Sequence, residues 1–139
     1  GAAHARVVDR FLAAAGDGDL DALLVVLDPQ VAGHTDSGGF VPAPLHRIVG
    51  RDRVASQFLR FLRGFDATLV SMPVNAEPGV LVFQAGRLLG VIAFEIRDHV
   101  IVQIHAIANP RKLGYVASML GVPLWVDPAT SPASAGATG

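Results

Sequence analysis

The spacing of apolar residues changes its period near residue 66, and this change limits the fold more than any other feature of the sequence. Before it, apolar side chains recur every three or four residues, as they do along one face of a helix. After it come four runs rich in β-branched residues, over 67–75, 79–85, 88–97 and 100–108. The turn segments expected between them are Glu77-Pro78-Gly79, Gly86-Arg87 and Asp98-His99. The sequence therefore predicts helices first and four antiparallel, hairpin-linked strands afterwards.

Helix start and stop signals give the boundaries of the other elements. Asp19 is a candidate N-cap, Pro29 stops the helix before it, and Gly121 is a candidate C-cap. Helices are predicted over 4–15, 20–27, 51–63 and 111–120, and a brief strand over 31–36. Helices gathered before a meandering sheet predict an α+β domain, with the helices covering one face of a curved antiparallel sheet. We expect one domain over 1–126 and a disordered tail over 127–139, which is small, polar and rich in proline and glycine.

Composition argues against several kinds of site. The chain has no cysteine, so thiolate metal sites and disulfides are absent, and its five histidines have no metal-ligand spacing. Eleven basic and twelve acidic residues give a net charge of −1, which does not favour direct binding of nucleic acid by this domain. No apolar run is long enough to cross a membrane. We expect no metal, no cofactor and no membrane association, and a cytoplasmic location.

Four ordered segments resemble a known family. They are GDLDALLVVLDP (18–29), DSGG (36–39), IVGRDRVASQFL (48–59) and NPRKL (109–113). With the order of elements, they are similar to the SnoaL-like domain at the C-terminus of extracytoplasmic-function (ECF) RNA polymerase sigma factors. The resemblance covers about residues 6–120. It implies the cone-shaped fold shared with nuclear transport factor 2, ketosteroid isomerases and polyketide cyclases, and a chain excised from a longer protein.

The resemblance also implies a function and the residues that carry it. The family's first motif is usually Asp-Gly-Gly-Gly-Lys and its second Asn-Pro-Asp-Lys-Leu. The matching positions, expected to be regulatory or to contact a partner, are Asp36, Gly38, Gly39, Asn109, Pro110, Lys112 and Leu113. Ser37, Phe40 and Arg111 depart from the pattern, with one basic side chain lost and one charge reversed. The implied role is non-catalytic regulation of transcription initiation in cis. Its implied partners are the sigma-factor regions of the same full-length chain, RNA polymerase and a small apolar ligand.

A small enzyme of the polyketide cyclase or ketosteroid isomerase kind, acting on an apolar carbonyl compound, is the alternative. His34 and Asp36 alternate onto one side of the first strand, where the carboxylate could orient the imidazole as a general base. Asp36 before Ser-Gly-Gly fits a side-chain-capped turn equally well. Four aromatic residues could line an apolar ligand pocket or simply form core: Phe58, Phe61, Phe94 and Trp125.

Alternation along the last strand predicts which residues face away from the helices. Its even positions are wholly apolar, so His105 and Gln103 are expected on the outer face, between Ile101 and Ile107. Glu95 and Arg97 are expected on the same outer side. Such a face could bury itself in a homodimer or against a partner domain.

Overall fold

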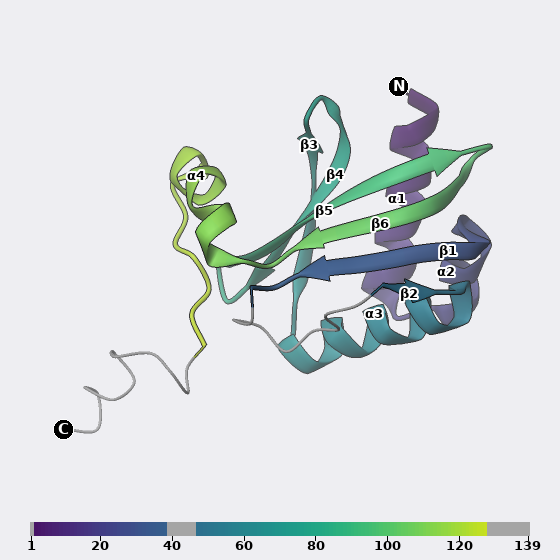
Figure 1. The fold of residues 1–139 in the computed structure, drawn as a ribbon, viewed down its shortest axis with the longest axis horizontal. Helices are drawn as coiled ribbons and strands as arrows, with labels where there is room; N and C mark the ends of the chain where they lie inside the picture. The colour runs from purple at the N-terminus through teal and green to yellow at the C-terminus, as the bar shows by residue number, and fades with distance from the viewer. Residues whose placement is uncertain (1, 39–46, 128–139) are drawn as a thin grey trace.

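A computed structural model describes residues 2–38 and 47–127 of the chain. This part of the protein contains four helices and a six-stranded sheet, and Figure 1 shows their arrangement. The helices are α1 (Ala2–Asp17), α2 (Leu20–Val26), α3 (Arg51–Phe65) and α4 (Pro110–Leu120). The strands are β1 (Leu27–Asp36), β2 (Ile48–Val49), β3 (Thr68–Val74), β4 (Glu77–Gln84), β5 (Arg87–Arg97) and β6 (Val100–Ile107). The α+β class and the four hairpin-linked strands are confirmed.

The sheet is mixed, which corrects the expected all-antiparallel arrangement. Its strand order is β2-β1-β6-β5-β4-β3, and β1 runs parallel to β6 while all other pairs are antiparallel. β1 also starts earlier than predicted, at Leu27, and β2 was not predicted at all. The parallel pairing matters for function, because it places the ends of β1 and β6 side by side.

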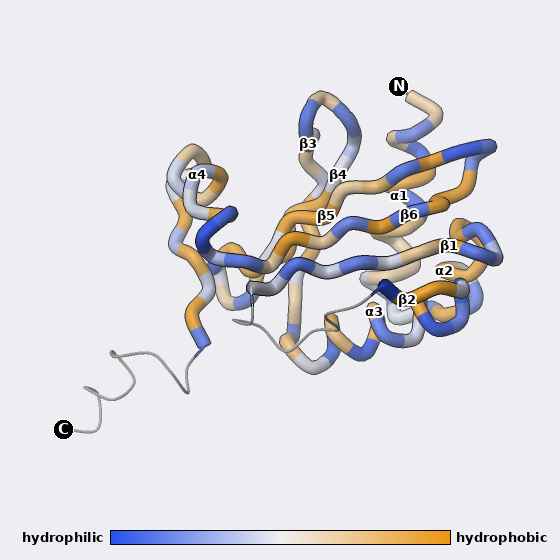
Figure 2. Tube along the Cα trace, viewed as in Figure 1, coloured by the Kyte–Doolittle hydropathy of each residue, from blue (hydrophilic) through white to orange (hydrophobic). Residues whose placement is uncertain are grey.

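Helices α1, α2 and α3 pack on one face of the sheet and close the main core. Phe11 of α1, which is fully buried, lies 5.1 Å from Phe58 of α3 and 5.0 Å from Phe94 of β5, between ring centroids. Rings at these separations stabilise one another beyond the apolar area they bury. In Figure 2 the middle of β5 is hydrophobic, while the tip of the β5–β6 hairpin is hydrophilic.

The fourth helix packs on the opposite face of the sheet, so the helices do not all cover one side. Leu113 of α4 joins a second, smaller core with Leu81 of β4 and Val91 of β5. Leu113 is only 2% exposed. Part of the outer face is thus covered by the chain itself.

A β-bulge changes the side to which the first residues of β6 point. The register of β5 against β6 pairs Glu95 with Gln103 but Ile96 with Ile101, which leaves Val102 as an extra residue. Ile101 is therefore fully buried in the main core, although simple alternation placed it on the outer face. Beyond the bulge the alternation holds, since Ile104 is buried and His105 is exposed.

The hairpin turns test the turn residues inferred from the sequence. Asp98 and His99 form the β5–β6 turn as predicted, with φ of 52° and 66°. The β3–β4 turn is Asn75–Ala76 and not the expected Glu77-Pro78-Gly79, which belongs to β4. Two residues at positive φ suit the right-handed twist of a tight hairpin.

Two expectations fall on residues outside the described ranges. The disordered tail was predicted over 127–139, of which the structure describes only Asp127, and Gly39 and Phe40 also lie outside. Within the described ranges, no helix combines the length and apolar character needed to span a membrane.

Candidate functional site

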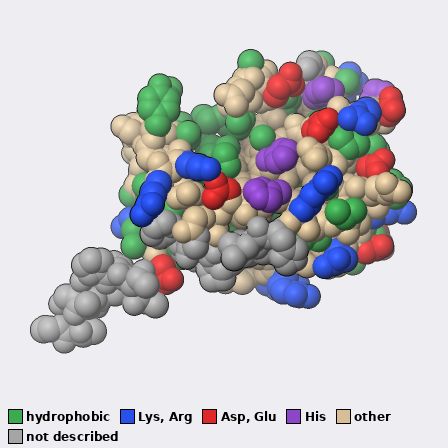
Figure 3. Space-filling model, in the orientation of Figure 1, with side chains coloured by type: hydrophobic (Ala, Val, Ile, Leu, Met, Phe, Trp, Pro, Cys, Tyr) green, Lys and Arg blue, Asp and Glu red, His purple; other side chains and the backbone are tan. Residues whose placement is uncertain are grey.

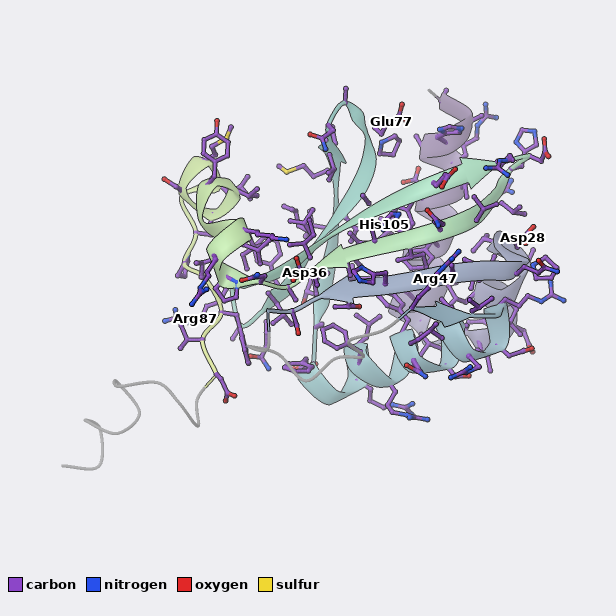
Figure 4. The ribbon with its side chains drawn as sticks, viewed as in Figure 1. Asp28, Asp36, Arg47, Glu77, Arg87 and His105 are labelled. Carbon is purple, nitrogen blue, oxygen red and sulfur yellow. The ribbon has the colours of Figure 1, made fainter. Side chains whose placement is uncertain are left out.

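The parallel pairing of β1 with β6 brings the two motif segments together. Asp36, the last residue of β1, is in register with Ile107 of β6, and its carbonyl oxygen accepts a 2.7 Å hydrogen bond from the backbone N–H of Ala108. Asn109, which begins the second motif, follows directly. Figure 4 shows Asp36 at the end of β1, next to the start of α4. The segments 36–38 and 109–112, some 70 positions apart in the chain, thus lie side by side, and we call this contact region the joint.

The Asp36 carboxylate is the centre of this joint. The Lys112 ammonium donates a hydrogen bond to its Oδ2, and the backbone N–H of Gly38 and the Asn109 side chain add further hydrogen bonds. The hydrogen bond from Lys112 is the main reason why the pKa of Asp36 lies below its ordinary value of 3.8. Partial desolvation of the carboxylate acts in the opposite direction and raises this pKa. The carboxylate is therefore ionised at neutral pH and is paired rather than free.

Asn109 links this carboxylate to the start of α4. Its backbone is extended, with φ of −92° and ψ of 113°, because Pro110 at the first helical position disfavours the helical region for the preceding residue. Its side chain caps the helix by accepting a 3.1 Å hydrogen bond from the backbone N–H of Arg111. This bond uses the main chain of Arg111, so the departure from the family's aspartate leaves the cap intact.

Gly38 fits beneath Asn109 because it has no side chain. Its φ is +59°, and a Cβ placed on it would lie 2.7 Å from Cγ and Nδ2 of Asn109. Any other residue would meet both a left-handed backbone and a steric overlap. Ser37 is 1% exposed, the one buried polar residue in the described part of the chain. The first motif therefore requires glycine at position 38.

Six of the seven predicted regulatory positions meet at this joint. Asp36, Gly38, Asn109 and Lys112 interact directly, Pro110 starts the helix, and Leu113 anchors it to the outer face. Gly39 lies outside the described residues. Lys112 and Asp36 keep 59% and 28% of their side-chain surface exposed, so the joint can be reached by a partner.

This geometry gives little support to the alternative hypothesis that the domain is an enzyme with His34 and Asp36 as its catalytic residues. His34 pairs in register with His105 on the outer face, while Asp36 is held by Lys112. The apolar cavity lies on the helix-covered side and measures about 110 Å³. Pockets for drug-sized ligands are typically about 300–1,000 Å³. Gly33, His34 and Thr35 of β1 border this cavity, but Asp36 does not.

The four aromatic residues predicted to line a pocket divide into two pairs. Phe58 and Phe61 line the cavity, but Phe94 and Trp125 do not. Phe94 is packed against Phe11, and Trp125 lies edge-on to Phe65 with ring centroids 5.6 Å apart. Both are held in core contacts, which were the competing interpretation for these aromatics.

Trp125 also fixes the segment that follows α4. Its indole N–H donates to Gln84 Oε1, its backbone N–H donates to Leu88 O (2.9 Å), and Leu88 N–H donates to Pro123 O (2.8 Å). The end of the described chain is thereby attached to the β4–β5 hairpin.

The outer face carries the polar residues that alternation predicted. His105 and Gln103 are joined by a 3.0 Å hydrogen bond, and Arg97 donates to Glu95 at 3.1 Å. Arg47, just before β2, lies beside them in Figure 4 and was not singled out from the sequence, since no strand was predicted there. The homodimer through this face stays a prediction.

Comparison with known proteins finds relatives among the ECF sigma factors. The chain is 41% identical over 120 residues to the probable ECF RNA polymerase sigma factor SigI of Mycobacterium tuberculosis, covering 86% of this chain and 40% of that protein. It is 32% identical over 127 residues to the ECF sigma factor SigJ of the same organism, covering 79% of this chain and 39% of SigJ. The chain thus spans about two-fifths of the length of the relatives it matches. No family model matches it.

Solved structures agree in fold. The crystal structure of M. tuberculosis SigJ aligns with a TM-score of 0.66 and 29% identity, over 80% of this chain and 44% of that one. A SnoaL-like protein of unknown function from Burkholderia thailandensis aligns with a TM-score of 0.57 and 20% identity, over 76% and 93% of the two chains. The second likeness concerns the fold alone. The chain therefore has the SnoaL-like, nuclear transport factor 2-like fold and is similar in sequence to part of the ECF sigma factors SigI and SigJ.

Proposed function

We propose that this domain is the C-terminal regulatory module of an ECF sigma factor and modulates transcription initiation in cis. The observation that carries the proposal is the 41% identity to SigI over 86% of the chain. In this proposal the partners are the sigma-factor regions of the same full-length chain and, through them, RNA polymerase, which places the site of action in the cytoplasm.

The joint formed by Asp36, Gly38, Asn109 and Lys112 supports a mechanical role in that regulation. A capped helix start, a charged hydrogen bond and a close glycine contact all fix the direction in which α4 leaves the sheet. Charge-assisted hydrogen bonds are stronger than neutral ones and restrict geometry. The joint would hold α4 in the orientation that the sigma-factor regions recognise.

The outward face of α4 supports the same role. Tyr115 is 75% exposed and Met119 69% exposed, and they stand four residues apart on neighbouring turns of one helix face. Two large apolar side chains together on a surface are typical of a contact site for another protein segment. We assign them to contact with the sigma-factor regions of the same chain.

Sensing of a small apolar effector is a further part of the proposal. The 110 Å³ cavity, lined by Phe58 and Phe61, restricts such an effector to about the size of benzene, which occupies an engineered apolar cavity of about 150 Å³. A ligand that binds the native state alone raises the melting temperature by mass action. A melting temperature unchanged by benzene and toluene would remove this part of the proposal.

The test of regulation is transcription by RNA polymerase reconstituted with the full-length sigma factor that carries this domain. Asp36→Ala and Asn109→Ala should change the amount of transcript from the target promoter, because they release the start of α4. Arg60→Ala, an exposed position on α3, is the control. Circular dichroism must show that all three variants are folded. If both joint variants transcribed as the wild type does, the proposed role of the joint would be rejected.

A further inference from the structure

A shallow hollow of about 260 Å³ lies on the outer face of the sheet and shares Gly33, His34 and Ile104 with the lining of the apolar cavity. Its polar lining comes from three neighbouring segments and consists of Arg47, His34, His105 and Gln103. Figure 3 shows two histidines side by side near the middle of this face with a basic side chain next to them, and Figure 4 labels His105 and Arg47 there.

Strand register explains why these side chains converge. His34 of β1 is the in-register partner of His105 of β6. β1 and β2 pair antiparallel with Gly33 opposite Ile48, so the next position along brings Arg47 beside His34. The other residues that line the hollow are Ala32, Gly33 and Ile104.

The charges around the hollow leave it positive. Two acidic groups on the same face already have cations of their own, because Asp36 is paired with Lys112 and Glu95 with Arg97. Within residues 2–38 and 47–127, no ion pair engages Arg47. A guanidinium beside two imidazoles is a combination that binds phosphate or carboxylate oxygens.

The hydrogen bond between His105 and Gln103 orients one of these imidazoles. Nε2 of His105 lies 3.0 Å from Oε1 of Gln103, and this contact holds the ring in place beside the hollow. Imidazoles change charge between about pH 5 and 8. The charged and titratable groups of this face that surround them are Arg47, Asp36, Lys112, Glu95 and Arg97.

We propose that this hollow is a binding site for a small oxyanion, a phosphate- or carboxylate-bearing molecule held by Arg47, His34 and His105. Binding strengthens as the pH falls. This site is independent of the proposed contact between α4 and the sigma-factor regions. Its volume and its opening to solvent suit a compact anion rather than a large apolar substrate.

Sulfate is the probe for the test, because its charge does not change between about pH 5.5 and 8, so any pH dependence comes from the protein. Sodium sulfate is titrated into the isotopically labelled protein at constant ionic strength, with sodium chloride as the salt control. The imidazole resonances of His34 and His105 should shift saturably with sulfate and not with chloride. The dissociation constant should be about tenfold lower at about pH 5.5 than at about pH 8, as expected for added charged hydrogen bonds.

Three variants locate the site, and all change exposed or solvent-facing side chains. Arg47→Gln should weaken sulfate binding about tenfold at both pH values. The double variant His34→Gln/His105→Gln should bind weakly and lose the pH dependence. Arg53→Gln, exposed on α3, is the matched control and should bind as the wild type does. Parallel titrations with inorganic phosphate and acetate distinguish phosphate-bearing from carboxylate-bearing ligands. Wild-type binding by the double variant, or no saturable shift of either imidazole, would overturn the proposal.

Discussion

A Cβ atom on residue 38 would lie 2.7 Å from Cγ of Asn109, so Gly38 packs against Asn109 too closely for any side chain at position 38. The contact joins two motifs that lie far apart in the sequence. The joint therefore depends on shape as well as on charge.

Gly38→Ala should destabilise the fold measurably. A non-glycine residue in the left-handed region costs about 1–2 kcal/mol, and displacement of the Asn109 side chain adds to that cost. We expect the free energy of unfolding to fall by about 2 kcal/mol and the melting temperature by about 4–8 °C. Gly64→Ala is the control: Gly64 lies in α3, nothing lies within 4 Å of where its Cβ would be, and it should tolerate or gain from the change. Equal melting temperatures for the two variants would contradict the steric account.

Lys112→Met should make stability less dependent on pH in the acidic range. The pKa of Asp36 is lowered in the folded state, mainly by the Lys112 hydrogen bond. A lowered pKa means that the stabilising contribution is present above the ordinary value of 3.8 and is lost as the pH falls through the folded-state pKa. The wild type should be the more stable protein at about pH 7, and the gap should shrink at about pH 3.

Urea unfolding at the two pH values measures this gap. Arg60→Met, an exposed basic position on α3, is the control for removal of a positive charge far from Asp36. A gap for Lys112→Met that stays constant down to about pH 3 would show that the ion pair is not its cause.

Local signals in the sequence identified most of the elements, because hydrophobic period and capping residues act over a few positions. Asp19 caps α2 as predicted, accepting from the backbone N–H of Ala22 at 3.1 Å, and Gly121 ends α4 with φ of 67°. The helices and the four hairpin strands follow from such signals. The capping role of Asn109 was not predicted, and α4 starts at Pro110, one residue before the predicted start.

Features that depend on contacts between distant parts of the chain could not be predicted from such local signals. The parallel pairing of β1 with β6 joins residues some 70 positions apart, and no short-range pattern encodes it. The bulge at Val102 reverses the alternation, so Ile101 enters the core although it stands at an odd position. The hydrogen bond between Lys112 and Asp36 depends on that same pairing, which is why the motifs were recognised but their contact was not.

Ala106→Val should stabilise the domain by filling part of the apolar cavity. Ala106 of β6 lines this cavity, whose volume is about 110 Å³. Each added buried CH₂ contributes about 0.8 kcal/mol, reduced by any strain, so we expect a gain of about 1 kcal/mol. Ala93→Val is the control, because Ala93 pairs with His105 on the outer face and does not line the cavity. A loss of stability on thermal unfolding for Ala106→Val would show that the cavity walls cannot accept the added atoms.

Trp125→Phe should weaken the attachment of the chain end to the β4–β5 hairpin. The variant keeps a ring against Phe65 but removes the donor to Gln84 Oε1, leaving a half-buried acceptor without that partner. Such a loss costs about 1–3 kcal/mol. A double-mutant cycle with Gln84→Met, followed by circular dichroism during urea unfolding, isolates the bond, with an expected coupling of about 1 kcal/mol. The cycle is needed because Gln84 also donates to the Phe65 carbonyl at 2.8 Å, so the single Gln84→Met variant loses two hydrogen bonds. Additive effects of the two substitutions would mean that ring packing, and not the indole hydrogen bond, holds this segment in place.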